Sequence, residues 1–107
     1  MRVKVSILLS PADPIILEVG EHLIGRSDPE AGIIPEIDLE NFDAEAKVSR
    51  KHAMLRVTRN GATIEDLGSL NGTFINRRPR LAISTKHPLA SGDEVAIGAT
   101  FLKIEFL

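Results

Sequence analysis

Apolar residues recur at every second position along much of this chain, and that spacing limits the folds open to it. Near the N-terminus, apolar residues occupy the odd-numbered positions Val3, Val5, Ile7 and Leu9, while the residues between them are mostly polar. Successive side chains of a β-strand point to opposite faces, so a period of two predicts strands with one buried face. No stretch has both the 3.6-residue period and the length of a substantial amphipathic helix. The pattern predicts an all-β fold.

Asn60–Gly61 marks the clearest turn. This pair suits the positive φ angles of a two-residue type I′ turn, and it lies at the centre of an alternating stretch from Ala53 to Leu67. The expected hairpin places Val57 opposite Ile64, so that apolar residues meet on one face.

A second hairpin turn is predicted at Gly98–Ala99, with Val95 opposite Leu102. Gly, Pro and Asn separate many short strands along the chain, which indicates a β-sandwich or a barrel. A length of 107 residues is typical of one domain, so residues 1–107 are expected to share a single core. Because the chain ends on a predicted core strand, we expect it to be a module of a larger protein.

Composition excludes several classes of site. The chain has no cysteine, which rules out disulfides, thiolate metal sites and a cysteine nucleophile. Its histidines, His22, His52 and His87, lack the spacing of metal ligands, so neither a metal ion nor a cofactor is expected. No membrane span or export signal is visible, and together with the lack of cysteine this predicts a cytoplasmic location.

The charge balance argues against nucleic-acid binding. A net charge of −2 provides no basic excess for coating phosphate backbones, and the chain has no Trp, no Tyr and only 4 Phe for stacking on bases. A small basic cluster at one site is still compatible with these totals. We therefore expect neither a nucleic acid nor a membrane as partner.

Three loop segments carry side chains suited to recognition. Gly25–Arg26 follows one predicted strand, Ser49–His52 precedes another, and Asn71–Thr73 follows a Gly-Ser turn. Each segment is common by itself, as a turn glycine, a polar loop or a simple turn. Their order, spacing and strand context coincide here, which favours one shared site.

Together these segments resemble the forkhead-associated (FHA) domain, a module that binds phosphothreonine peptides. In that family a Gly-Arg pair closes an early strand, a Ser-Arg-x-His motif precedes a central strand, and an Asn-Gly-Thr motif follows. Phe74–Asn76 and residues 89–98 also resemble the family. The resemblance implies an all-β sandwich of two mainly antiparallel, twisted sheets with about eleven short strands, and binding loops at one end.

The resemblance implies that Arg26 and Ser49 contact phosphate, that Arg50 is a further contact to phosphate or peptide, and that Asn71 clamps the peptide backbone. Lys47 would lie near the third residue after the phosphothreonine. Phosphothreonine carries about −1.5 to −2 charges and three acceptor oxygens, which fit the planar donors of arginine and a serine hydroxyl.

Other residues are implied to support the site rather than to touch the ligand. The resemblance makes His52 architectural, with its ring bonded between the binding loops, and Thr73 ties the same region. Gly25 and Gly72 allow sharp turns or close approach of the backbone. Leu70, by contrast, is implied to be a phosphopeptide-binding position. It departs from the many relatives that carry a polar residue there, which puts the peptide preference of this chain in question.

The function expected is phosphopeptide recognition in signalling, without catalysis and without a small-molecule substrate. The partner would be a phosphothreonine-containing protein that is a substrate of a Ser/Thr kinase. One alternative is a phosphate-independent interaction or oligomerisation module on the same fold. A more remote alternative is a hydrolase in which Ser49 and His52 act with Asp66 or Asp93, although the chain has no Gly-x-Ser-x-Gly elbow.

Overall fold

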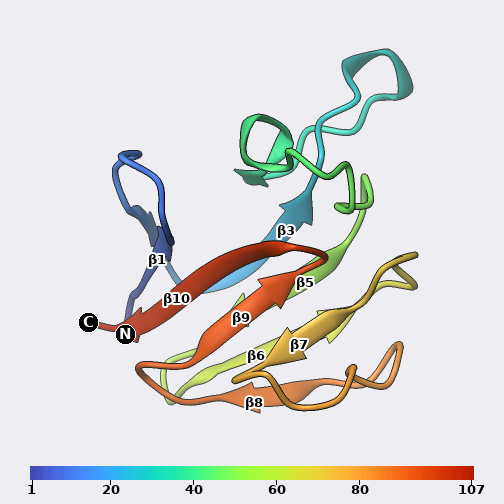
Figure 1. Ribbon diagram of the computed structural model, residues 1–107. Coiled ribbons are helices and arrows are strands. Elements are labelled where there is room, and N and C mark those ends of the chain that lie inside the picture. The colour runs from blue at the N-terminus through green and yellow to red at the C-terminus, as the bar shows by residue number, and fades with distance from the viewer.

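Two five-stranded sheets pack face to face in a computed structural model that describes all residues, 1–107 (Figure 1). One sheet has the strand order β2-β1-β10-β9-β7 and the other the order β4-β3-β5-β6-β8. The strands are β1 (Val3–Ile7), β2 (Ile15–Leu17), β3 (Gly20–Gly25), β4 (Ile37–Asp38), β5 (Ala53–Val57), β6 (Ala62–Asp66), β7 (Thr73–Ile75), β8 (His87–Leu89), β9 (Glu94–Ile97) and β10 (Thr100–Phe106). Two 3₁₀ turns, η1 (Pro29–Ala31) and η2 (Glu40–Phe42), lie in the connections.

The all-β sandwich expected from the sequence is confirmed, with one difference in strand number. The structure has ten strands rather than about eleven. Asp28–Ile33 and Asp66–Ile83 pair only as isolated bridges, too short to form further strands. Every pairing between strands is antiparallel except that of β3 with β4. Neither 3₁₀ turn is long or apolar enough to cross a membrane.

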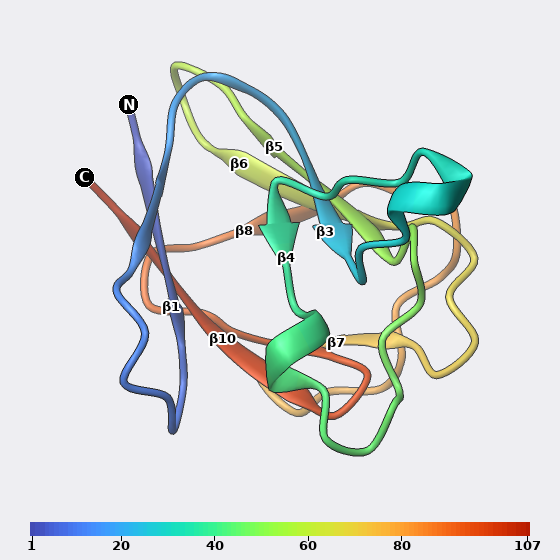
Figure 2. The same cartoon turned by 90° about the horizontal axis from the view of Figure 1, so that it is seen from above.

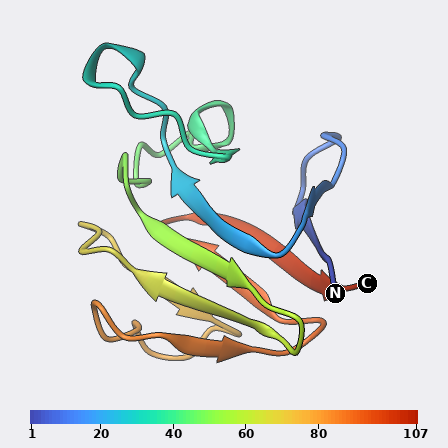
Figure 3. The same ribbon diagram turned by 180° about the vertical axis from the view of Figure 1, so that it is seen from behind.

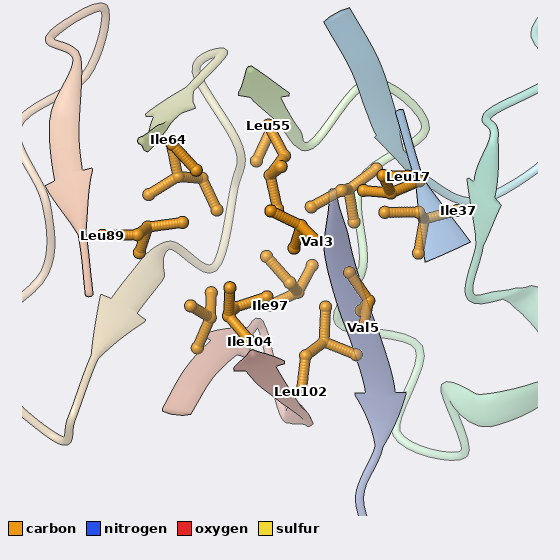
Figure 4. Packing of buried hydrophobic residues seen from close by; sticks show 14 of the residues in the cluster. Val3, Val5, Leu17, Ile37, Leu55, Ile64, Leu89, Ile97, Leu102 and Ile104 are labelled. Atoms are coloured by element: carbon orange, nitrogen blue, oxygen red, sulfur yellow. The ribbon is translucent and has the colours of Figure 1, made fainter. Parts of the chain in front are cut away.

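The alternation along the strands builds the core. In β1, β5 and β6 every second residue is buried, as the period of two predicts. A cluster of 19 buried hydrophobic residues from both sheets fills the space between them (Figure 4). The two chain ends lie next to each other, and Leu107 N–H donates to the carbonyl of Arg2 at 2.9 Å.

The register predicted for the β5–β6 hairpin is wrong by two residues. Val57 lies opposite Ala62, and Ile64 lies opposite Leu55. The same side chains still face the core, because a shift of two positions leaves every side chain on its original face.

The turn of this hairpin explains the shift. Neither Asn60 nor Gly61 has a positive φ, so they do not form a type I′ turn. Instead Thr58 to Gly61 make a four-residue loop, in which Thr58 N–H and its hydroxyl both donate to the carbonyl of Gly61, at 2.8 and 3.1 Å. The threonine side chain therefore favours the longer loop.

The predicted β9–β10 hairpin is confirmed. Gly98 has a φ of +59°, and Val95 lies opposite Leu102 as expected. The positive φ suits glycine, which has no Cβ to oppose it. This turn positions Gly98 beside the loop that carries Lys47, at the end of the sandwich described next.

Candidate functional site

Three loops distant in sequence meet at one end of the sandwich (Figures 2 and 3). Arg26 N–H, just after β3, donates to the carbonyls of Ser49 and Arg50, both at 3.2 Å. From the β6–β7 loop, Leu70 N–H donates to Ser49 Oγ at 3.1 Å, and Asn71 Nδ2 donates to the carbonyl of Lys47 at 3.2 Å. The three segments singled out in the sequence therefore form one cluster.

Gly25 makes the first of these junctions possible. A Cβ built on Gly25 would lie 1.8 Å from the carbonyl oxygen of Arg50, well inside van der Waals contact. Only a residue without a side chain allows the backbone before β5 to approach the end of β3 so closely. The glycine thus sets the position of Arg26 relative to Ser49.

The guanidinium of Arg26 is held at one nitrogen and free at the others. Its Nε donates to the carbonyl of Val48 at 3.3 Å, while no protein acceptor pairs with the terminal nitrogens. The residue is half-buried, so its side chain has limited freedom. A planar donor held in this way suits an oxyanion such as phosphate.

Ser49 keeps its hydroxyl proton available. Its Oγ accepts the hydrogen bond from Leu70 N–H, and its own N–H donates to His52 Nδ1 at 3.0 Å. An Oγ that already accepts can still donate, since a hydroxyl has one proton and two lone pairs. The side chain of Leu70 is 82% exposed, so this residue contributes its backbone N–H to the site and presents an apolar side chain to solvent.

Asn71 joins two loops and retains an acceptor. Its Nδ2 is bound to the carbonyl of Lys47, whereas its Oδ1 makes no hydrogen bond within the protein. An amide oxygen in that position can accept a backbone N–H of a bound peptide. The side chain of Lys47 is exposed beside it.

Arg50 is partly engaged within the protein. Its Nη1 lies 3.1 Å from Oδ2 of Asp28, and the Arg50 side chain is 52% exposed. Asp28 lies in the connection between β3 and β4. The ion pair places Arg50 at the rim of the cluster, with a carboxylate as its resting partner.

His52 bonds the binding loops to each other from beneath. Its ring is fully buried, Nδ1 accepts from Ser49 N–H, and Nε2 lies 2.8 Å from the carbonyl of Gly72. These two partners require the neutral ring with its proton on Nε2, because Nδ1 must accept and Nε2 must donate. Desolvation by burial outweighs the bond to Gly72 and lowers the pKa of His52.

The depressed pKa of His52 predicts how stability depends on pH. In the unfolded chain, His52 takes up a proton near pH 6.5, the ordinary pKa of histidine. In the folded protein, His52 takes up that proton only at a lower pH. The unfolded state therefore binds more protons below that pH, and the free energy of unfolding falls as pH drops through this range. Thermal unfolding followed by far-UV circular dichroism between pH 7.5 and 5 measures the effect.

The variant His52→Asn isolates this contribution, because every other ionisable group is the same in both proteins. We expect its melting temperature, although lower, to vary less with pH than that of the wild type. An equal pH dependence in the two proteins would contradict a neutral, buried His52.

Asp66 organises the β6–β7 loop, a role that the sequence analysis missed. Its buried carboxylate accepts the N–H groups of Gly68 and Ser69, both at 2.8 Å, and the hydroxyls of Ser69 and Thr73, at 2.6 and 2.7 Å. Burial by itself would raise the pKa of Asp66, but these hydrogen bonds outweigh it and hold the pKa below the ordinary value. The signal in the sequence is Asp66 followed by Gly68 and Ser69, a typical aspartate turn.

The hydrolase arrangement is not formed. Both ring nitrogens of His52 are bonded to backbone groups, and neither contacts the hydroxyl of Ser49. Asp66 orients Ser69 and Thr73 instead of His52. Nor are three or more His, Asp and Glu side chains placed together to hold a metal ion.

Arg80 is a second residue that the sequence analysis missed. Its side chain lies over Gly72, where a Cβ would be 3.0 Å from Arg80 Cδ, and its guanidinium donates to the carbonyls of Ser69 and Leu70. Gly72 has a φ of +92°, so a glycine is favoured there for conformation as well as for space. Arg80 thereby supports the Asn71 loop through two of its backbone carbonyls.

Removing Arg80 should weaken ligand binding without removing a ligand contact. Each of its hydrogen bonds contributes about 1 kcal/mol, so we expect Arg80→Ala to weaken phosphopeptide binding by roughly three- to tenfold through a less ordered Asn71 loop. Fluorescence anisotropy measures the change. Arg78→Ala removes the same charge from the same loop, and no hydrogen bond of the Arg78 side chain is found, so it should bind like the wild type. Equal losses in the two variants would indicate a charge effect instead.

Comparison with known proteins agrees with this geometry. The family model for the FHA domain matches residues 22–98. The chain belongs to the FHA family. An oxoglutarate dehydrogenase inhibitor from Corynebacterium diphtheriae is 43% identical over 76 residues, covering 71% of this chain and 49% of the relative. The glycogen accumulation regulator GarA from Mycobacterium tuberculosis is 41% identical over 76 residues, covering 71% of this chain and 43% of the relative.

Among solved structures, the FhaA FHA domain in complex with the intracellular domain of Rv3910 has a TM-score of 0.77 and 25% identity. That match covers 96% of this chain and 99% of the FhaA domain. The chain spans about half the length of the C. diphtheriae relative. The cluster of Arg26, Ser49 and Asn71 lies within the residues that the FHA family model matches.

Proposed function

We propose that this FHA domain binds a phosphothreonine-containing segment of a partner protein, with Arg26 and Ser49 on the phosphate and Asn71 on the peptide backbone. The observation that carries the proposal is the pairing of an arginine and a serine whose backbones are bonded to each other and whose outer donors are unused. Donors fixed before the ligand arrives need little reordering on binding, which favours affinity.

Arg50 and Lys47 add positive charge at the rim. Arg50 can exchange its ion pair with Asp28 for the phosphate, since half of its side chain is exposed. Lys47 is exposed beside Asn71, in reach of residues that follow the phosphothreonine. We propose that these two residues tune affinity and peptide preference, while Arg26 and Ser49 distinguish the phosphorylated from the unmodified threonine.

The expected discrimination is large. A hydrogen bond to a charged group contributes about 1.5 to 3 kcal/mol, so losing two or three of them on dephosphorylation weakens binding by roughly 100-fold or more. Such a ratio makes the interaction switchable by a Ser/Thr kinase and its opposing phosphatase. We propose that the partner is a kinase substrate, and that the domain acts by binding without catalysis, because His52 has no free nitrogen to serve as a base.

The relatives support a regulatory role. One is an oxoglutarate dehydrogenase inhibitor, another is a regulator of glycogen accumulation, and the FhaA domain was solved bound to an intracellular protein domain. The first two names describe regulation, and the third describes a complex between two protein domains. We propose the same kind of role here, in the cytoplasm.

The direct test is fluorescence anisotropy with dye-labelled peptide libraries that carry phosphothreonine, phosphoserine, phosphotyrosine or unmodified threonine. A dye is needed because the protein has no Trp or Tyr. We expect saturable binding to the phosphothreonine library and at least 100-fold weaker binding to the unmodified one. Because the second phosphate pKa is about 6, affinity should fall as pH drops through that value. Equal binding of both libraries would refute the proposal.

A further inference from the structure

A groove beside the binding loops is lined by apolar side chains together with the polar residues Ser10, Glu40, Asn41, Asp43 and Thr100. It has a volume of about 570 Å³ and lies between the β1–β2 loop, the segment around η2 and the start of β10. In Figure 2, η2 lies by the start of β10, and the β1–β2 loop is to the left of η2. The large apolar side chains that line this β1–η2 groove are Ile7, Leu8, Leu9, Pro11, Phe42 and Phe101.

Leu9 occupies an unusual position at one side of the groove. Its φ of +60° lies in the left-handed region, and its side chain is fully exposed, at 106% of the reference area. Glycine or asparagine adopts this conformation with less strain, and neither would expose an apolar surface. Strained residues with exposed apolar side chains are concentrated at binding sites, where a ligand covers them.

Phe101 continues the apolar surface across the outer face of the sheet. Phe101 lies beside Leu8, the residue that follows β1, because Leu8 N–H donates to the Phe101 carbonyl. Phe101 also lies opposite Ala96 on β9, and Ala96 in turn lies opposite Phe74 on β7. The next outward residue of β10, Lys103, is charged and exposed. The outer face of an antiparallel sheet is ordinarily polar, so this apolar row is confined to the end of the sheet nearest the binding loops.

One continuous segment of the chain, from Phe42 to Val48, connects the groove with the phosphate site. The hydroxyl of Thr100 donates to the carbonyl of Phe42 at 3.1 Å, which fixes η2 to β10. The carboxylate of Asp43 accepts the N–H groups of Lys47 and Val48 at 2.7 and 3.0 Å. Val48 then holds Arg26 through its carbonyl. The segment that lines the groove is therefore continuous with the segment that positions the phosphate donors.

We propose that the β1–η2 groove receives a large apolar side chain of the phosphorylated partner, from the residues that flank its phosphothreonine. This inference rests on the proposed function and adds a second determinant of specificity to it. The occupant follows from continuity, because Asp43 and Ala44, which line the groove, belong to the same loop as Lys47, and the Asp43 carboxylate accepts the Lys47 N–H. A side chain buried against Leu9 and Phe101 would add affinity that depends on its position in the peptide.

A leucine scan tests the groove. Labelled peptides carry a central phosphothreonine in an alanine, serine and glycine background, with a single leucine moved through the flanking positions. For each protein the measured quantity is the ratio of the dissociation constants of the leucine-free and leucine-containing peptides. We expect a ratio of about ten for the wild type at one or two neighbouring positions. The ratio should approach one in Leu9→Asn and in Phe101→Ser.

The two variants complement each other. Asparagine tolerates the left-handed conformation of residue 9, so Leu9→Asn should fold even if Phe101→Ser is destabilised. Leu107→Ser is the matched control, because Leu107 is also exposed and follows β10 on the same face, about 20 Å from Phe101. It should keep the wild-type ratio.

The possible failures are distinguishable. If the wild type binds the leucine-free phosphopeptide and no leucine position improves binding, the groove proposal is wrong and the phosphate site stands. A leucine gain that survives in both Leu9→Asn and Phe101→Ser would place the apolar contact elsewhere and would also overturn the proposal. If the wild type binds no phosphopeptide at all, the proposed function fails, and this inference fails with it.

Discussion

Replacing Arg26 with alanine is expected to abolish detectable phosphopeptide binding while the fold is retained. The side chain supplies the donors that no protein group uses, and only its Nε is bonded, to the carbonyl of Val48. Two charge-assisted hydrogen bonds contribute about 3 to 6 kcal/mol together, which corresponds to a loss of more than 100-fold. Anisotropy with the best phosphothreonine peptide measures the loss, and far-UV circular dichroism reports on the fold.

Two further variants give this experiment its controls. Arg26→Lys keeps the positive charge but not the planar pair of donors, so we expect an intermediate affinity. Arg59→Ala removes an arginine from the exposed β5–β6 loop and should bind as the wild type does. If Arg26→Ala bound normally, or if its spectrum were that of an unfolded chain, Arg26 would not be the phosphate contact described above.

Replacing Gly25 with alanine is expected to cause the largest loss of stability of any single methyl addition in this chain. The new Cβ would lie 1.8 Å from the carbonyl oxygen of Arg50, a backbone atom that cannot rotate away. The end of β3 and the segment before β5 would have to separate, which breaks the hydrogen bonds from Arg26 N–H. We expect the free energy of unfolding to fall by more than about 3 kcal/mol, with phosphopeptide binding lost as well.

Gly61→Ala is the matched control for this substitution. A Cβ at Gly61 meets no atom within 4 Å, and the residue has no positive φ. The free energy of unfolding of Gly61→Ala should change by less than about 0.5 kcal/mol, since the new methyl group meets open space and the backbone is unstrained. Urea unfolding followed by circular dichroism compares the two variants. Similar stabilities for Gly25→Ala and Gly61→Ala would contradict this prediction, because the end of β3 and the segment before β5 would then separate at little cost in free energy.

Local patterns in the sequence were sufficient for the strands and for one of the two hairpins. The burial of every second residue in β1, at Val3, Val5 and Ile7, follows from strand geometry alone. Gly98 supplies the positive φ that a short turn needs. The β5–β6 register could not be obtained in this way, because the Thr58 hydroxyl stabilises a longer loop than Asn60–Gly61 suggested.

The sequence predicted those residues of the candidate site that belong to the three loop motifs. Arg26 and Ser49 carry donors of the kinds that a phosphate requires, and Asn71 is recognisable by its place in the Asn-Gly-Thr motif. Asp66 and Arg80 were missed, because their roles are contacts to backbone groups of the β6–β7 loop. Aspartate and arginine are ordinary surface residues until the structure shows what they bind.

By itself the sequence determined an all-β chain and the residue types available to a phosphate, since both depend on side-chain parity and on local chemistry. The tertiary structure decided which loops meet and how closely, because these depend on contacts between residues far apart in the chain. Gly25 illustrates the difference: the sequence shows a glycine, and only the approach of the Arg50 carbonyl shows why no other residue fits. The groove beside Leu9 and Phe101 likewise exists only where β1, η2 and β10 come together.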